Sequence, residues 1–211
     1  MKHRLTIILA ALVAIIPFGS NSVVSSQSPA GARLNVAVKD GNGVPVRDAV
    51  IMVYPAKGSG GLRYKSGKAV MNQRNIQFDP GTIIVGKGTT VSFPNRDRVR
   101  HNVYSFSKAA RFEMKLYGKD QSRSQNFPIA GTVALGCNIH DEMKGFVKVV
   151  DTPYAAKTDH NGLVQIASLP SGSAKLKVWH PKNRVRGGET VIDIAITGSV
   201  ANQTVKLALR R

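Results

Sequence analysis

The sequence contains only one cysteine, Cys137, among 211 residues. A single cysteine cannot form a disulfide within its own chain, so the fold has no covalent cross-link of that kind. The thiol must then be a buried inert side chain, an intermolecular bridge, a nucleophile or a metal ligand. A structural zinc site, which usually collects several Cys and His ligands, does not match this composition.

Acidic residues are also scarce, with 12 Asp and Glu against 30 Lys and Arg, for a formal net charge of +18. The basic residues are scattered along the chain rather than gathered in one run. A charge of this sign favours acidic partners or surfaces. Because the sequence has no nucleic-acid-binding motif, we do not expect nucleic acid to be the partner.

The chain lacks a hydrophobic run long enough for a membrane span, which needs about 20 apolar residues. The longest run, Leu5 to Phe18, follows the basic residues Lys2 and Arg4 and precedes small residues. This pattern predicts a signal peptide within residues 1–32, cut after about residue 22 or 32. We therefore expect a protein exported to the periplasm, in a Gram-negative bacterium, with no transmembrane segment after signal removal and no cysteine near the cut for lipid attachment.

Helical periodicity is absent as well, and the pattern predicts an all-β protein. Turn sequences such as "DGNG", "DPG", "DHNG" and "LPSG" separate short alternating or β-branched runs. Many short strands with frequent turns are typical of sandwiches and Greek-key barrels. The predicted strands cover residues 34–38, 49–54, 83–85, 89–93, 101–106, 132–135, 146–150, 163–166, 174–179, 190–196 and 204–209.

Two separated segments share one style of sequence. They are "LNVAVKDGNGVPVRDAVIMVYP" (34–55) and "KTDHNGLVQIASLPSGSAKLKVWHP" (157–181). Together they resemble the two halves of a carboxypeptidase regulatory-like, transthyretin-like β-sandwich. About one hundred residues separate the halves, and insertion of a domain at an exposed loop would explain this. Two tandem domains with an extra N-terminal hairpin are the alternative.

The insertion hypothesis divides the chain into five parts. These are the signal peptide (1–32), the first part of the regulatory-like sandwich (33–57), a linker (58–70), an inserted domain (71–151) and the remainder of the sandwich (152–211).

The stretch "GCNIHDEM" (136–143) concentrates the metal-binding chemistry, because Cys137 is followed at intervals of three by His140 and Met143. This spacing lets one tight loop surround a metal ion from several sides. A further imidazole, His101, lies upstream at the start of a predicted strand. A soft thiolate and a thioether beside two imidazoles suit copper.

The inserted segment resembles the cupredoxins, of the plastocyanin and amicyanin kind. The matching residues of "GTTVSFPNRD" and "HNV" are Gly88, Val91, Phe93, Asn95, His101, Asn102 and Val103. The resemblance implies a Greek-key sandwich holding one type 1 (blue) copper. It makes His101, Cys137 and His140 the equatorial ligands and Met143 the axial ligand. Asn102 would tie the histidine strand to the cysteine loop by hydrogen bonding.

The whole mature chain, through "LGCNIHD" and "VWHP", resembles exported proteins often labelled methylamine utilization proteins. The position after Asp141, often Trp in that group, is Glu142 here. The cupredoxin resemblance implies one-electron transfer with a redox-protein partner, which we expect to be an acidic protein or a c-type cytochrome. The run Arg96, Arg98 and Arg100 is either a solvated face or a positive rim that steers an acidic partner.

An enzymatic role is not expected. A multicopper oxidase needs many histidines, and only His160 and His180 remain outside the proposed site in the mature chain. A binuclear copper centre needs two cysteines. A cysteine nucleophile would need a partnered base and would leave Met143 and His101 unexplained. A copper carrier or an envelope structural module without electron transfer stays open as the alternative.

The aromatic residues interpreted as core are Phe93, Tyr104, Phe106, Phe127 and Phe146.

Overall fold

The computed structural model describes residues 31–210, and these form β-strands joined by turns, with one 3₁₀ turn, η1 (Arg186–Gly188). The predicted all-β class is confirmed, since no α-helix occurs in this part of the chain. Nor does any helix within these residues have the length and apolar character to cross a membrane. The predicted signal peptide falls almost wholly outside the described residues.

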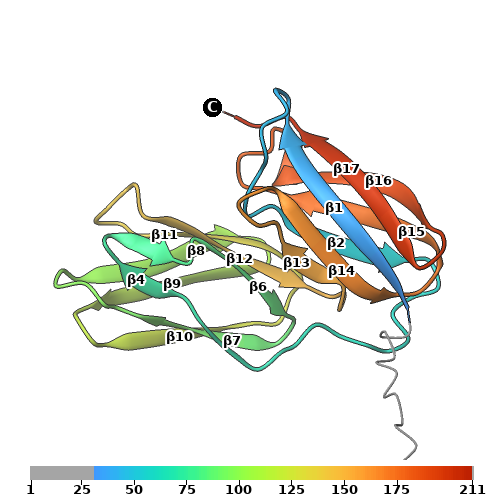
Figure 1. Cartoon of the computed structure of the whole chain (residues 1–211). Helices are drawn as coiled ribbons and strands as arrows, with labels where there is room; N and C mark the ends of the chain where they lie inside the picture. Colours follow the sequence, from blue (N-terminus) through green and yellow to red (C-terminus); the bar gives the residue numbers. More distant parts are fainter. Residues whose placement is uncertain (1–30, 211) are drawn as a thin grey trace, which may run out of the picture.

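Two sheets built from both ends of the chain form what we call the terminal sandwich (Figure 1). One sheet has the order β14-β1-β17 and the other the order β13-β2-β15-β16. Its strands are β1 (Ala32–Asp40), β2 (Val50–Pro55), β13 (Ala155–Lys157), β14 (Leu163–Leu169), β15 (Gly172–Trp179), β16 (Glu189–Ile196) and β17 (Val200–Leu207).

The middle of the chain forms what we call the central sandwich, drawn in green to yellow in Figure 1. Its sheets have the orders β10-β7-β3 and β6-β12-β11-β8-β9, and a hairpin, β4-β5, accompanies them. Its strands are β3 (Lys68–Val70), β4 (Asn72–Arg74), β5 (Gln77–Asp79), β6 (Thr82–Gly86), β7 (Thr89–Pro94), β8 (His101–Ser107), β9 (Ala110–Tyr117), β10 (Ser122–Phe127), β11 (Gly131–Gly136) and β12 (Lys144–Val150).

Strand pairing relates the two sandwiches to the sequence. Strand β1 pairs in parallel with β17, from Arg33 opposite Val200 to Asp40 opposite Leu207, and antiparallel with β14. Strand β2 pairs with β13 and β15. The first two strands thus pair with late strands, while β3 to β12 belong to other sheets. The predicted domain boundaries stay predictions, and β3 lies within the segment predicted as a linker.

Each sandwich has its own apolar core, and a smaller cluster joins them. The joining cluster includes Val50, Val150 and Trp179. The Phe146 ring packs edge-on against Trp179, with centroids 5.4 Å apart. Beside it, the buried ammonium of Lys148 binds Glu189 of β16, so apolar and ionic contacts hold the sandwiches together.

Candidate metal centre

Three strands of the five-stranded sheet bring the candidate ligands to one end of the central sandwich. His101 is the first residue of β8, and Cys137 directly follows β11. His140 lies in the loop between β11 and β12, and Met143 directly precedes β12. Since β11 pairs with both β8 and β12, the sheet register places the start of β8 beside this loop.

The structure brings together His101, Cys137 and His140. One ligand atom from each lies within 4.8 Å of the others. Cys137 Sγ is 3.9 Å from His101 Nδ1, and the two imidazole centroids are 5.1 Å apart with the rings inclined by 63°. Zn and similar ions bind such atoms at about 2.0–2.3 Å, which puts ligand atoms roughly 3–4 Å apart. These three side chains are therefore spaced to share one ion.

Burial distinguishes the candidate ligands. His101, Cys137 and Met143 are buried, whereas His140 is half-buried beside the exposed Ile139. His140 Nδ1 is nonetheless shielded from solvent, and it has no hydrogen-bond partner among residues 31–210. A buried polar atom without a partner costs about 1–3 kcal/mol. A bound metal ion would satisfy it.

Met143 closes the loop that carries the thiol. Its backbone N–H donates to His140 O at 2.9 Å, which makes the turn between them tight. Its side chain belongs to the same buried apolar cluster as Cys137. The fourth predicted residue thus lies in the same buried core as Cys137.

Asn102 links the histidine strand to the cysteine loop. The backbone N–H of Asn138 donates to Asn102 Oδ1 at 2.8 Å. On the other side of the loop, Tyr104 of β8 lies over Gly136, where a Cβ atom would stand only 2.5 Å from the ring. A larger residue before Cys137 would therefore have to displace the end of the Tyr104 ring, a contact that the sequence did not reveal.

Sequence reasoning also missed Asp97, whose carboxylate contacts His101. His101 Nε2 donates to Asp97 Oδ2 at 2.8 Å, and the N–H groups of Asn75 and Ile76 donate to the same carboxylate. Burial pushes the pKa of Asp97 up, but the N–H donors and the imidazole outweigh it and hold this pKa below its ordinary value. The four-residue spacing to His101 was the available signal, and in a loop such spacing does not place two side chains together.

A buried polar network supports the segment between Asn95 and His101. Asn95 Nδ2 donates to the carbonyls of Val99 and Tyr117, at 2.8 and 3.2 Å. The Tyr117 hydroxyl donates to Phe93 O at 2.7 Å. Burial raises the pKa of Tyr117 to about 12, although the hydrogen bond from a glutamine amide opposes this rise.

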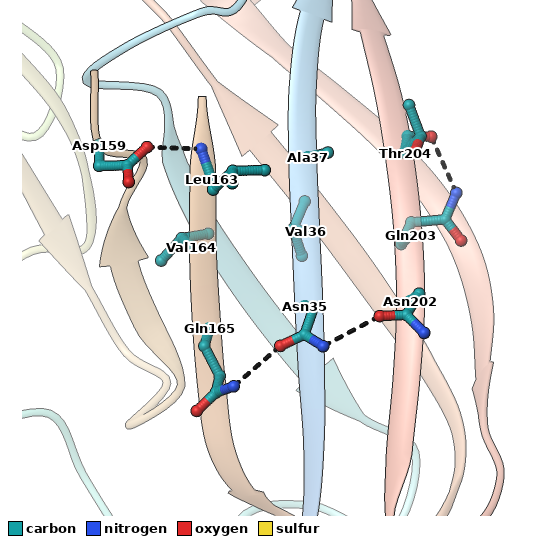
Figure 2. A pocket seen from close by; sticks show the side chains of 10 residues that line it. All are labelled: Asn35, Val36, Ala37, Asp159, Leu163, Val164, Gln165, Asn202, Gln203 and Thr204. Carbon is teal, nitrogen blue, oxygen red and sulfur yellow. Dashed lines mark hydrogen bonds between the residues drawn. The ribbon is translucent and has the colours of Figure 1, made fainter. Parts of the chain in front are cut away.

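A hollow of about 510 Å³ lies away from this centre, on the outer face of the sheet β14-β1-β17 (Figure 2). Asn35 donates to Asn202 at 2.9 Å and accepts from Gln165 at 2.9 Å, which forms a row of amides across the three strands. These amides largely satisfy one another, and the hollow contains none of the candidate ligands. The centre at the end of the central sandwich is the stronger candidate site.

No protein-family model and no curated protein sequence matches the chain. Among solved structures, a copper-containing nitrite reductase from Thermus scotoductus SA-01 is 22% identical, with a TM-score of 0.39 over 46% of this chain and 25% of that one. The Cu(I) form of an amicyanin mutant is 26% identical, with a TM-score of 0.38 over 49% of this chain and 99% of amicyanin. A reduced amicyanin mutant gives 25% identity, the same TM-score and the same coverage. Each likeness thus involves about half of this chain, and the chain spans a quarter of the nitrite reductase but nearly all of amicyanin.

Proposed function

We propose that the chain is a periplasmic electron-transfer protein with one type 1 copper, and that it is not an enzyme. His101, Cys137 and His140 would hold the metal, with Met143 as a weak fourth ligand. One observation carries the proposal: a buried thiol and two imidazoles lie with their ligand atoms within 4.8 Å of one another. His140 Nδ1, which is buried without a hydrogen-bond partner among the described residues, also supports it.

The donor set favours copper over other metals. A thiolate, two imidazoles and a weak thioether form a blue-copper site, whereas hard ions such as Mg²⁺ and Ca²⁺ prefer oxygen ligands. When bound, copper supplies one-electron chemistry between Cu(I) and Cu(II).

The chain itself would hold the ligands in place and exclude water. Strands β8 and β11 fix His101 and Cys137. The hydrogen bond from Asn138 to Asn102 fixes the loop that carries His140, the third ligand. Burial of the thiol shields it from oxidants and from other thiols. The half-buried His140 is the ligand through which a partner could approach.

An exposed arginine run beside the centre supports an acidic partner. Arg96, Arg98 and Arg100 are all exposed on the loop that leads to His101. The exposed Ile139 adds an apolar contact next to His140. We propose an acidic redox protein or a c-type cytochrome as the partner, because a positive rim steers association with such a surface.

The second candidate is a copper carrier or envelope structural module without electron transfer. The terminal sandwich favours it, because its own sheets and core form a second unit beside the candidate ligands, as a spacer or binding platform would. The two candidates differ in redox behaviour. A carrier needs affinity for copper, whereas an electron-transfer protein must also cycle between Cu(I) and Cu(II) without losing the metal.

The deciding experiment is an absorption spectrum of the purified protein with one equivalent of Cu(II). We expect an intense thiolate-to-copper band that returns after reduction and reoxidation. Cys137→Ser should abolish the band, and His160→Gln, which changes an exposed turn histidine, should leave it intact. A spectrum without the band, or one unaffected by Cys137→Ser, would contradict the type 1 assignment. A band that does not survive the redox cycle would favour the carrier.

A further inference from the structure

Three N–H groups converge on the carboxylate of Asp97. His101 Nε2 donates to Oδ2 at 2.8 Å, Ile76 N donates to Oδ2 at 2.9 Å, and Asn75 N donates to Oδ1 at 2.7 Å. An ionised carboxylate can only accept hydrogen bonds. The proton of the neutral ring therefore sits on Nε2, and the lone pair of Nδ1 is left on the side facing Cys137 Sγ, 3.9 Å away.

The backbone of Asp97 is itself held in place by a hydrogen bond to a buried side chain. Its backbone N–H donates to Asn95 Oδ1 at 2.8 Å, and Asn95 is fully buried. The Asn95 amide is in turn fixed by the carbonyls of Val99 and Tyr117. The Asn95 side chain thereby uses both its nitrogen and its oxygen in hydrogen bonds. The Asp97 carboxylate therefore has one well-defined position.

The same carboxylate holds the tip of the β4-β5 hairpin. Asn75 and Ile76 both have left-handed backbone conformations, with φ of 56° and 57°. Two-residue hairpin loops of this kind favour Asn followed by Gly, and a β-branched residue in this conformation is a rare outlier. Burial does not explain Ile76, because its side chain is 43% exposed. The cost of this backbone conformation is instead offset by the two hydrogen bonds that the N–H groups of Asn75 and Ile76 donate to Asp97.

We propose that Asp97 is the positioning residue of this metal centre: it selects the His101 tautomer that presents Nδ1 to the metal and fastens the tip of the β4-β5 hairpin to the ligand. The metal-binding part of this inference rests on the proposed function. Partners of this kind orient ligating histidines in many metal sites, and their loss typically costs 10- to 100-fold in metal affinity.

The tautomer is measured first, in the metal-free full chain, by long-range ¹H–¹⁵N NMR of the imidazoles. We expect His101 to carry its proton on Nε2 in the wild type and to show a mixture of tautomers in Asp97→Ala. Asp97→Asn keeps one accepting oxygen and should restore much of the Nε2–H form. Asp120→Asn is the matched control. Asp120 is an exposed carboxylate that pairs with Arg96, next to Asp97 in the chain, and it does not contact His101.

Affinity for Cu(II) and for Zn²⁺ alone is measured on the same four proteins. We expect Asp97→Ala to bind roughly 10- to 100-fold more weakly, Asp97→Asn to lie between it and the wild type, and Asp120→Asn to match the wild type. An unchanged tautomer and unchanged affinity in Asp97→Ala would overturn the inference. If Asp97→Ala fails to fold, Asp97→Asn carries the test, and an affinity equal to that of Asp120→Asn would be the contrary result.

The two measurements separate this inference from the proposed function. If the wild type binds Cu(II) without a thiolate-to-copper band, the type 1 assignment fails. The NMR comparison on the metal-free chain still decides whether Asp97 sets the tautomer of His101.

Discussion

The two sandwiches share the same kind of fold but use their interiors differently. The terminal sandwich has an almost wholly apolar core, built from residues such as Leu34, Val178 and Leu176. The central sandwich buries polar side chains at the end that holds the candidate ligands, among them Gln73 and Asn95. Buried polar groups cost free energy unless they are paired. The Asn95 amide is paired through both its nitrogen and its oxygen, whereas Gln73 Oε1 has no partner among residues 31–210. The comparison teaches that one half of the molecule is built for stability and the other for a defined site.

The largest effect is expected from the apolar core of the terminal sandwich. Leu176 is fully buried, and Leu176→Ala should lower the free energy of unfolding by about 2–5 kcal/mol, because it removes apolar contacts and leaves a cavity. Leu163→Ala, at an exposed position of the same sandwich, is the matched control. Urea denaturation measures both. The copper spectrum of the folded variant should not change, and loss of the thiolate band would show that the two halves are not independent.

A smaller, pH-dependent effect is expected from the polar core of the central sandwich. Burial raises the pKa of Tyr117 to about 12, from an ordinary value of 10.0. The folded state therefore keeps this proton when the unfolded chain loses it, and the stability that results is lost as the pH rises from about 10 to about 12. At about 1.4 kcal/mol per pKa unit, the loss is on the order of 2–3 kcal/mol.

Tyr117→Phe tests this difference through urea denaturation at a series of alkaline pH values. The variant should lose stability less steeply than the wild type over this range. Leu176→Ala provides the comparison, since its stability should fall in parallel with that of the wild type at every pH. Equal slopes for the wild type and Tyr117→Phe would contradict the assignment of this pH dependence to the central sandwich.

The smallest effect, which concerns the rate of electron transfer and not stability, is expected at the arginine run. Arg98→Glu combined with Arg100→Glu should slow oxidation of the Cu(I) form by hexacyanoferrate(III), a one-electron anionic oxidant, by about tenfold at low salt. The rates should converge at high ionic strength, where charges are screened. Lys39→Glu with Lys206→Glu makes the same charge change on exposed residues of the terminal sandwich. An equal slowing by both pairs would indicate net charge rather than a local rim.

The all-β class and many strands follow from the sequence, because half-buried strands alternate visibly. In β7, Val91 and Phe93 are buried, and Ser92 between them is half-buried. Strand β10, "SRSQNF", escaped prediction because it is an edge strand with polar side chains on both faces. Strand β9 has an alternating pattern through Phe112 and Met114 that could have been found. The short strands β3, β4, β5 and β13 depend on their partners more than on local pattern.

The interior was predicted less well for aromatic residues. Phe93 and Phe127 are buried as expected, but Phe106 is 66% exposed, and the prediction that it belongs to the core was wrong. Tyr104 and Phe146 are half-buried on the outer face of the five-stranded sheet, where Phe146 contacts the terminal sandwich. An aromatic residue in a strand indicates one covered face but does not say whether the core or a neighbouring unit covers it.

The closeness of His140 to Cys137 followed from motif and spacing, because the loop between them is short. The addition of His101 followed from the resemblance of its strand to the cupredoxins. Asp97 could not be predicted in the same way. Its contact with His101 depends on the path of a loop and on a hairpin tip more than twenty residues upstream. Such contacts arise from tertiary structure and leave no periodic signal in the sequence.

The parallel pairing of β1 with β17 has a consequence for the order of folding. Asn35 and Asn202, joined by a side-chain hydrogen bond, are 167 residues apart in the chain. Closing so large a loop is slow, whereas the strands of the central sandwich all lie between Lys68 and Val150. During synthesis, every strand of the central sandwich is available well before β17 exists. We therefore expect the central sandwich, which carries Cys137, to fold first. Strand β1 can pair with β17 only after the last strand of the chain has been made.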